Sequence, residues 1–122
     1  MQYIELLVMK EPSKELVGAS SIPLILTILE DGENYGYNII QRVKELSEEQ
    51  IQWKDGTLYP ILHKLEKKGL IVSFWKEAEN GRKRKYYKLL DQGKTALASE
   101  KENWLEMNRI FMRAWNLNPQ SI

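Results

Sequence analysis

One short stretch of the chain changes from helical to strand periodicity at a glycine. Before Gly69, four apolar side chains recur at the i, i+3, i+4, i+7 spacing of a helix face, namely Leu58, Ile61, Leu62 and Leu65. After it, residues 71–77 and 85–89 hold aromatic and β-branched residues on either side of a turn-rich loop with an Asn-Gly pair, which is typical of a β-hairpin. Glycine is the usual residue just past a helix end. The sequence therefore predicts a helix that leads directly into a hairpin.

A first helix is predicted over residues 13–30, although Pro23 lies inside it. Proline has no N–H and crowds the preceding turn. We therefore expect the helix either to restart there, with Ser20 or Ser21 as the N-cap, or to be kinked. Residues 31–34 then supply a turn.

Two more helices are predicted before the hairpin. One covers residues 35–46, and the other begins at Asp55 or Thr57 and ends near Lys68. Because a proline is tolerated only in the first helical turn, Pro60 favours Thr57 as the N-cap, with Asp55 as the alternative.

The last segment, from Asp91 to about Trp115, is predicted to be one long helix. Its apolar residues follow an approximate a/d pattern with charged residues between them: Leu97, Trp104, Met107, Phe111 and Ala114. A helix that follows a complete small domain has no core left in its own chain to cover such a stripe. A second copy of the chain is the simplest cover, so a homodimer is expected.

The order helix, helix, helix, strand, loop, strand is that of a winged helix-turn-helix. The predicted fold is therefore mainly α with a two-stranded β wing and a long C-terminal helix. We divide the chain into an N-terminal extension at 1–12, a DNA-binding domain at 13–90, and a dimerisation helix with its tail at 91–122.

Charge is unevenly spread along this nearly neutral chain. Residues 1–53 carry a net −5, residues 54–88 a net +6 and residues 89–122 a net zero, although the whole chain is only +1. A single basic third suits a polyanionic partner on one face of the protein.

The basic third contains two candidate DNA-contacting surfaces. With its leucines inward, the helix at 55–68 presents small, aromatic and cationic residues outward: Gly56, Tyr59, Pro60, His63, Lys64 and Lys67. Such a helix fits a major groove. The cations of residues 82–85 follow at the predicted hairpin, where they repel one another unless they face phosphates.

Enzymatic and membrane functions are disfavoured. The chain has no cysteine, one histidine and no phosphate-binding glycine loop, so we expect no disulfide, metal or cofactor and no catalysis. It has no apolar run of about eighteen residues and no signal-peptide pattern at its start, so a cytoplasmic protein is expected.

Three motifs closely resemble the PadR family of bacterial transcriptional regulators. They are Tyr-Gly-Tyr-Asn-Ile-Ile at 35–40, Gly-Thr-Leu-Tyr-Pro-Ile-Leu-His-Lys-Leu at 56–65 with its continuation to 71, and Gly-Arg-Lys-Arg-Lys-Tyr-Tyr-Lys-Leu at 81–89. Their order and spacing match the family, and the likeness covers about residues 13–115. The single C-terminal helix is similar to the compact subgroup of that family.

The resemblance implies a dimer built through the first and last helices, which represses transcription at a roughly palindromic operator. In some members a planar aromatic molecule releases the DNA. The resemblance also implies the DNA-contacting residues: Tyr37, Thr57, Tyr59, His63, Lys64, Gly81, Arg82 and Lys83. Trp104 falls where compact members place an aromatic residue facing the dimer-centre pore, although it could equally be a plain dimer-core residue.

Two positions depart from the family pattern. Leu90 stands where the family has a threonine that caps the final helix, so Asp91 is expected to take the cap. Lys83 replaces a common proline in the wing and should strengthen salt-sensitive binding. The alternative hypothesis keeps the fold but makes the chain an adaptor, which binds a small molecule or protein at the dimer interface without contacting DNA.

Overall fold

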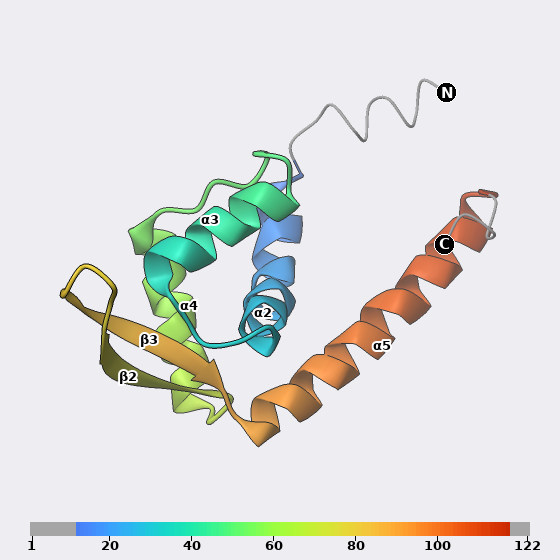
Figure 1. Cartoon of the computed structure of the whole chain (residues 1–122). Coiled ribbons are helices and arrows are strands. Elements are labelled where there is room, and N and C mark those ends of the chain that lie inside the picture. Colours follow the sequence, from blue (N-terminus) through green and yellow to red (C-terminus); the bar gives the residue numbers. More distant parts are fainter. Residues whose placement is uncertain (1–11, 118–122) are drawn as a thin grey trace.

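The computed structural model describes residues 12–117, which form a winged-helix body and one projecting helix (Figure 1). The predicted extension at 1–12 and the end of the tail therefore lie outside the described residues, apart from Pro12. The elements, in chain order, are α2 Lys14–Glu30, β1 Asn34–Tyr35, α3 Gly36–Leu46, α4 Asp55–Lys67, β2 Ile71–Glu77, β3 Lys83–Leu89 and α5 Asp91–Ala114. The predicted winged helix-turn-helix fold is confirmed.

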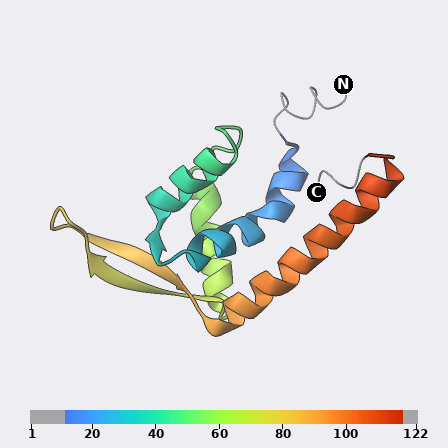
Figure 2. The ribbon, with the colours of Figure 1, turned by 45° about the vertical axis from the view of Figure 1, so that its right-hand side comes forward.

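Helix α2 does not restart at Pro23. It runs unbroken from an N-cap at Ser13, whose side chain accepts the backbone N–H of Leu16 at 3.2 Å. The hydroxyls of Ser20 and Ser21 donate to backbone carbonyls one turn earlier in the same helix, so neither residue caps a new one. Such back-bonding and an internal proline both favour bending, and the ribbon of α2 changes direction along its length in Figure 2.

The predicted N-caps of α4 were both wrong. Lys54 is the N-cap, and its carbonyl accepts the backbone N–H of Thr57 at 2.9 Å. Asp55 is consequently the first helical residue, where its charge favours the positive end of the helix dipole. Pro60 then lies beyond the first turn of α4. Because proline has no N–H, the carbonyl of Gly56, an exposed residue one turn earlier, accepts no helical hydrogen bond from residue 60.

The other end of α4 has the predicted glycine signal. Gly69 follows the C-cap Lys68 with φ +74°, its N–H donates to the Glu66 carbonyl at 3.0 Å, and the N–H of Leu70 donates to the Leu65 carbonyl at 3.1 Å. This pair of bonds is a Schellman motif, which requires a left-handed residue. Strand β2 starts two residues later and directs the wing back along α4.

The wing is part of a three-stranded antiparallel sheet in the order β1-β3-β2. The short strand β1, where Tyr35 pairs with Tyr86, was missed because residues 31–34 were taken as a turn. Strand β3 also begins at Lys83 rather than Lys85. Three of the four cations at residues 82–85, namely Lys83, Arg84 and Lys85, are therefore strand residues with alternating orientations.

The core lies where α2, α3 and α4 meet the base of the hairpin. Its buried hydrophobic residues include Ile25, Leu26, Ile39, Val43, Leu58, Leu62, Leu65, Ile71, Tyr87, Leu89 and Leu97. All three inward leucines of the predicted α4 face are fully buried. This leaves the opposite face of α4 open to a partner.

Helix α5 is attached to the body by its first half. Leu90 is the N-cap residue and Asp91 the first helical residue, so the predicted cap at Asp91 was wrong. Gly93 and Leu97 are buried, and the Lys101 ammonium lies 3.0 Å from the carboxylate of Glu30 in α2. Beyond this ion pair the helix leaves the body in Figures 1 and 2.

No helix among the described residues is long and apolar enough to cross a membrane.

Candidate nucleic-acid interface

A hollow of about 700 Å³ separates the wing from the N-terminal ends of α3 and α4. We call it the wing groove and define it by its lining residues: Tyr35, Gly36, Tyr37, Tyr59, Trp75, Arg82, Lys83, Arg84 and Lys85. Four of these are cations and four are aromatic. Basic and aromatic side chains around one concave surface are suited to a nucleic-acid backbone.

Gly36 determines how closely α3 and α4 approach beside the wing groove. A β-carbon at Gly36 would lie only 2.8 Å from Cζ of the Tyr59 ring, so this position has no room for a side chain. The phenol of Tyr59 therefore packs on the start of α3, next to Tyr37, which is 64% exposed. Two tyrosines from different helices thus line one hollow.

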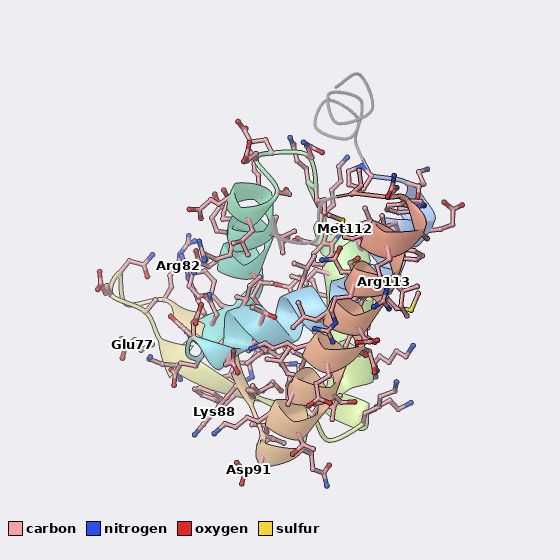
Figure 3. The ribbon with its side chains drawn as sticks, turned by 90° about the vertical axis from the view of Figure 1, so that its right-hand side faces the viewer. Glu77, Arg82, Lys88, Asp91, Met112 and Arg113 are labelled. Atoms are coloured by element: carbon pink, nitrogen blue, oxygen red, sulfur yellow. The ribbon has the colours of Figure 1, made fainter. Side chains whose placement is uncertain are left out.

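The wing loop directs Arg82 to this hollow. The loop is closed by the Ala78 N–H, which donates to the Arg82 carbonyl at 2.7 Å, and by the Arg82 N–H, which donates to Asn80 Oδ1 at 3.1 Å. Gly81 has φ +80°, a conformation that L side chains rarely adopt. In Figure 3 Arg82 lies on the side of the wing nearer to α3, far from Met112 and Arg113 near the end of α5.

The consecutive wing cations have different surroundings. The guanidinium of Arg84 lies 4.5 Å from the centre of the Tyr35 ring, and Arg84 is half-buried. Arg82, Lys83 and Lys85 are exposed. Arg84 therefore helps hold β1 to the wing through a cation–π contact, whereas the other three can face an anion.

A carboxylate connects α4 to the wing. Glu66 Oε2 accepts the backbone N–H of Ser73 at 3.0 Å and its hydroxyl at 2.6 Å. The Ser73 hydroxyl, its N–H, and the charges of Lys85 and His63 together lower the pKa of Glu66, although burial opposes them. The negative charge of Glu66 is therefore stabilised where β2 passes α4.

A second contact supports the opposite face of the wing. The Lys76 ammonium donates to the Glu33 carboxylate at 2.7 Å and lies 4.8 Å from the centre of the Tyr86 ring. The hydrogen bond to Glu33 raises the pKa of Lys76. Phe74 stacks on the same Tyr86 ring, with centroids 6.1 Å apart. This face is occupied by internal contacts, so the wing groove lies on the other face.

The model of the transcriptional regulator PadR-like family matches residues 25–99, which include α3, α4 and the complete wing.

The chain belongs to the PadR family.

Similar proteins agree with the family match. A transcriptional regulator of Mycobacterium tuberculosis is 37% identical over 79 residues, which are 65% of this chain and 70% of that protein. A PadR family transcription regulator from Clostridium difficile is 36% identical, with a TM-score of 0.69 over 79% of this chain and 97% of that one. A PadR-like regulator from Bacillus cereus is 25% identical, with a TM-score of 0.77 over 86% and 100%. This PadR protein is a DNA-binding transcriptional regulator.

The eight residues that the PadR resemblance implies for DNA contact do not form a single cluster. Tyr37, Tyr59, Arg82 and Lys83 line the wing groove, and Gly81 lies in the adjoining loop. The other three residues lie elsewhere on α4. His63 and Lys64 are exposed farther along the helix, and Thr57 lines a second hollow of about 510 Å³ between α2 and α4.

Trp104 lies far along α5 on its open side. It is 39% exposed, and its indole N–H donates to Glu100 one turn earlier at 3.2 Å. Farther along, the rings of Phe111 and Trp115 stack at 4.9 Å. Trp104 thus has no part in the wing groove.

Sequence reasoning missed three groove residues. Gly36 and Tyr35 belong to the first PadR motif but were given no role, because nothing local indicates that Tyr59 packs against them. Trp75 was likewise given no role. Its position in strand β2, in register with Lys85, places it in the groove.

Proposed function

We propose that this PadR protein is a homodimeric repressor that reads a palindromic operator with two α4 helices. Each α4 enters a major groove and each wing reaches the flanking minor groove, so that half-sites lie about one DNA turn apart. The contacts are those implied by the family: Tyr37, Thr57, Tyr59, His63, Lys64, Gly81, Arg82 and Lys83. The wing groove, which joins Tyr37 and Tyr59 to three exposed wing cations, carries this proposal.

The homodimer is supported by the open stripe of α5. Trp104, Met107 and Phe111 recur along one side of the helix, and each is about 40% exposed in the single chain. An apolar stripe of this kind is normally covered. A second α5 supplies a matching stripe by symmetry.

The proposed effector site is the part of the dimer interface at Trp104. Two Trp104 indoles brought together across the dimer would form a flat apolar site for a planar ligand. Binding there changes the relative orientation of the two winged domains and so weakens the fit to both half-sites. We divide the chain accordingly into an extension at 1–12, a DNA-binding domain at 13–90 and a dimerisation helix at 91–122. The protein works by binding rather than catalysis, in the cytoplasm.

The test is fluorescence anisotropy of the full chain against the duplex upstream of its own gene. A scrambled duplex of the same composition is the control, and both are measured at two salt concentrations. We expect tight binding to the upstream duplex, with an affinity much higher than that for the scrambled duplex. Equal, weak binding to both that salt abolishes would contradict specific regulation by this DNA and favour the adaptor hypothesis. Release of the bound duplex by planar aromatic compounds tests the effector.

A further inference from the structure

Trp75 is the most exposed large hydrophobic residue of the described chain, at 68%. The other three tryptophans have partners: Trp53 is buried in the core, Trp104 donates to Glu100, and Trp115 stacks on Phe111. Within residues 12–117, no hydrogen bond, ring contact or cation–π contact involves the side chain of Trp75. The fold therefore gains little from this indole.

The direction of Trp75 follows from strand geometry. Alternate residues of β2 share a face, so Trp75 points to the same side as Ser73, which binds Glu66 of α4. Lys85 lies opposite Trp75 in the register of β2 and β3. Trp75 thus lines the wing groove on the side that faces α4, with Tyr59 across from it.

We propose that Trp75 binds the sugar–phosphate backbone of the operator duplex, with its ring against a deoxyribose and its N–H toward a phosphate oxygen. This inference rests on the proposed function. A DNA strand alternates apolar sugars with anionic phosphates. This edge of the wing groove likewise combines an apolar indole with cationic side chains. Lys85 is the cross-strand partner of Trp75, and Arg82, Lys83 and Lys85 line the same hollow as the indole. Phosphate and sugar contacts position a protein on the duplex without reading sequence.

The inference makes Trp75 distinguishable from the wing cations. An uncharged contact displaces no counterion, so Trp75→Ala should weaken binding without changing its dependence on salt. A backbone contact is also independent of sequence. The variant should therefore lose affinity by the same factor, roughly tenfold, for the upstream duplex and for its scrambled control.

The experiment measures anisotropy titrations of wild type, Trp75→Ala and Val72→Ala with both duplexes over a salt series. Val72 is a matched control, because it is an exposed apolar residue of the same strand on the opposite face. Unchanged thermal unfolding midpoints establish that the variants fold. Tryptophan emission that changes on addition of the duplex to wild type, but not to Trp75→Phe, places the indole at the DNA.

The inference is supported if Trp75→Ala reduces the affinity for both duplexes by the same factor and leaves the dependence of affinity on salt unchanged. If Trp75→Ala binds with wild-type affinity, or loses affinity only for the upstream duplex, the inference about Trp75 is overturned while the proposed function stands. Wild-type protein that binds neither duplex refutes the proposed function, and this inference fails with it.

Discussion

Glu66 accepts two hydrogen bonds from Ser73, and these bonds link helix α4 to strand β2 of the wing. In the proposed complex, both α4 and the wing fit the same duplex. Their relative position is therefore part of the binding site, even though neither Glu66 nor Ser73 lines the wing groove.

Glu66→Gln should lower the free energy of unfolding by about 0.5–1 kcal/mol at neutral pH, because an amide oxygen replaces a charge-assisted acceptor. Since the folded-state pKa of Glu66 is lowered from 4.5, its contribution is present above pH 4.5 and is lost as the pH falls through the folded pKa. Urea unfolding over this range measures the difference between wild type and variant. Glu79→Gln, in the exposed wing loop, is the control; an equal effect there would count against the Ser73 link.

Lys83→Ala should reduce affinity for all duplexes by a similar factor and flatten the plot of log affinity against log salt by about one. Lys83 is exposed at the wing groove, where its ammonium can displace one counterion. Lys94→Ala is the matched control, because Lys94 lies on α5 beside Asp91, away from the wing. An unchanged slope for Lys83→Ala would show that the wing does not contact phosphate.

Trp104→Ala should weaken the homodimer by about tenfold or more, as expected when a large aromatic is removed from the centre of an interface. Sedimentation equilibrium measures the dissociation constant. Leu105→Ala is the control, since Leu105 is the next residue, is more exposed and points about 100° away around the helix. Similar dissociation constants for the two variants would argue against the α5 stripe as the interface.

Gly93→Ala should destabilise the protein by about 2 kcal/mol. Its β-carbon would clash with the Leu70 carbonyl oxygen and lie 2.6 Å from Cδ1 of Leu89. Gly18→Ala is the contrasting control, because a β-carbon there meets no atom within 4 Å and helix propensity alone should raise stability by about 0.5–1 kcal/mol. Thermal unfolding followed by circular dichroism distinguishes the two. A neutral Gly93→Ala variant would mean that α5 is not held against Leu70.

The sequence predicts those parts of this fold that depend on local periodicity. The buried leucines of α4, the glycine that ends it and the extent of β2 all follow from spacing within a few residues. Helix starts were predicted less well. The N-caps Lys54 and Leu90 make no side-chain capping bond, so residue type does not mark them. Strand β1 is also invisible locally, because two residues become a strand only by pairing with β3.

The candidate site also contains residues that the local sequence indicates and residues that depend on contacts between distant segments. The wing cations are evident from the sequence, but the separate role of Arg84 depends on the Tyr35 ring, which lies about fifty residues earlier in the chain. Similarly, Gly36 matters because Tyr59 of another helix packs on it. Contacts between distant segments create the wing groove, whereas composition only indicates its charge.

The attachment of α5 by its first half makes the rest of the helix a lever arm. From Lys101 to Ala114 a rigid helix spans about 20 Å at 1.5 Å per residue. A rotation of about 10° at its base would therefore carry the far end by about 3 Å. In a symmetric pair, the same leverage acts in reverse: a small adjustment where two such arms meet is transmitted to the winged domains as an angular displacement. Gly93 lies where α5 is attached to the body, and its lack of a side chain allows the close packing there. In such a pair, Gly93 thereby helps determine how far apart the two winged domains lie.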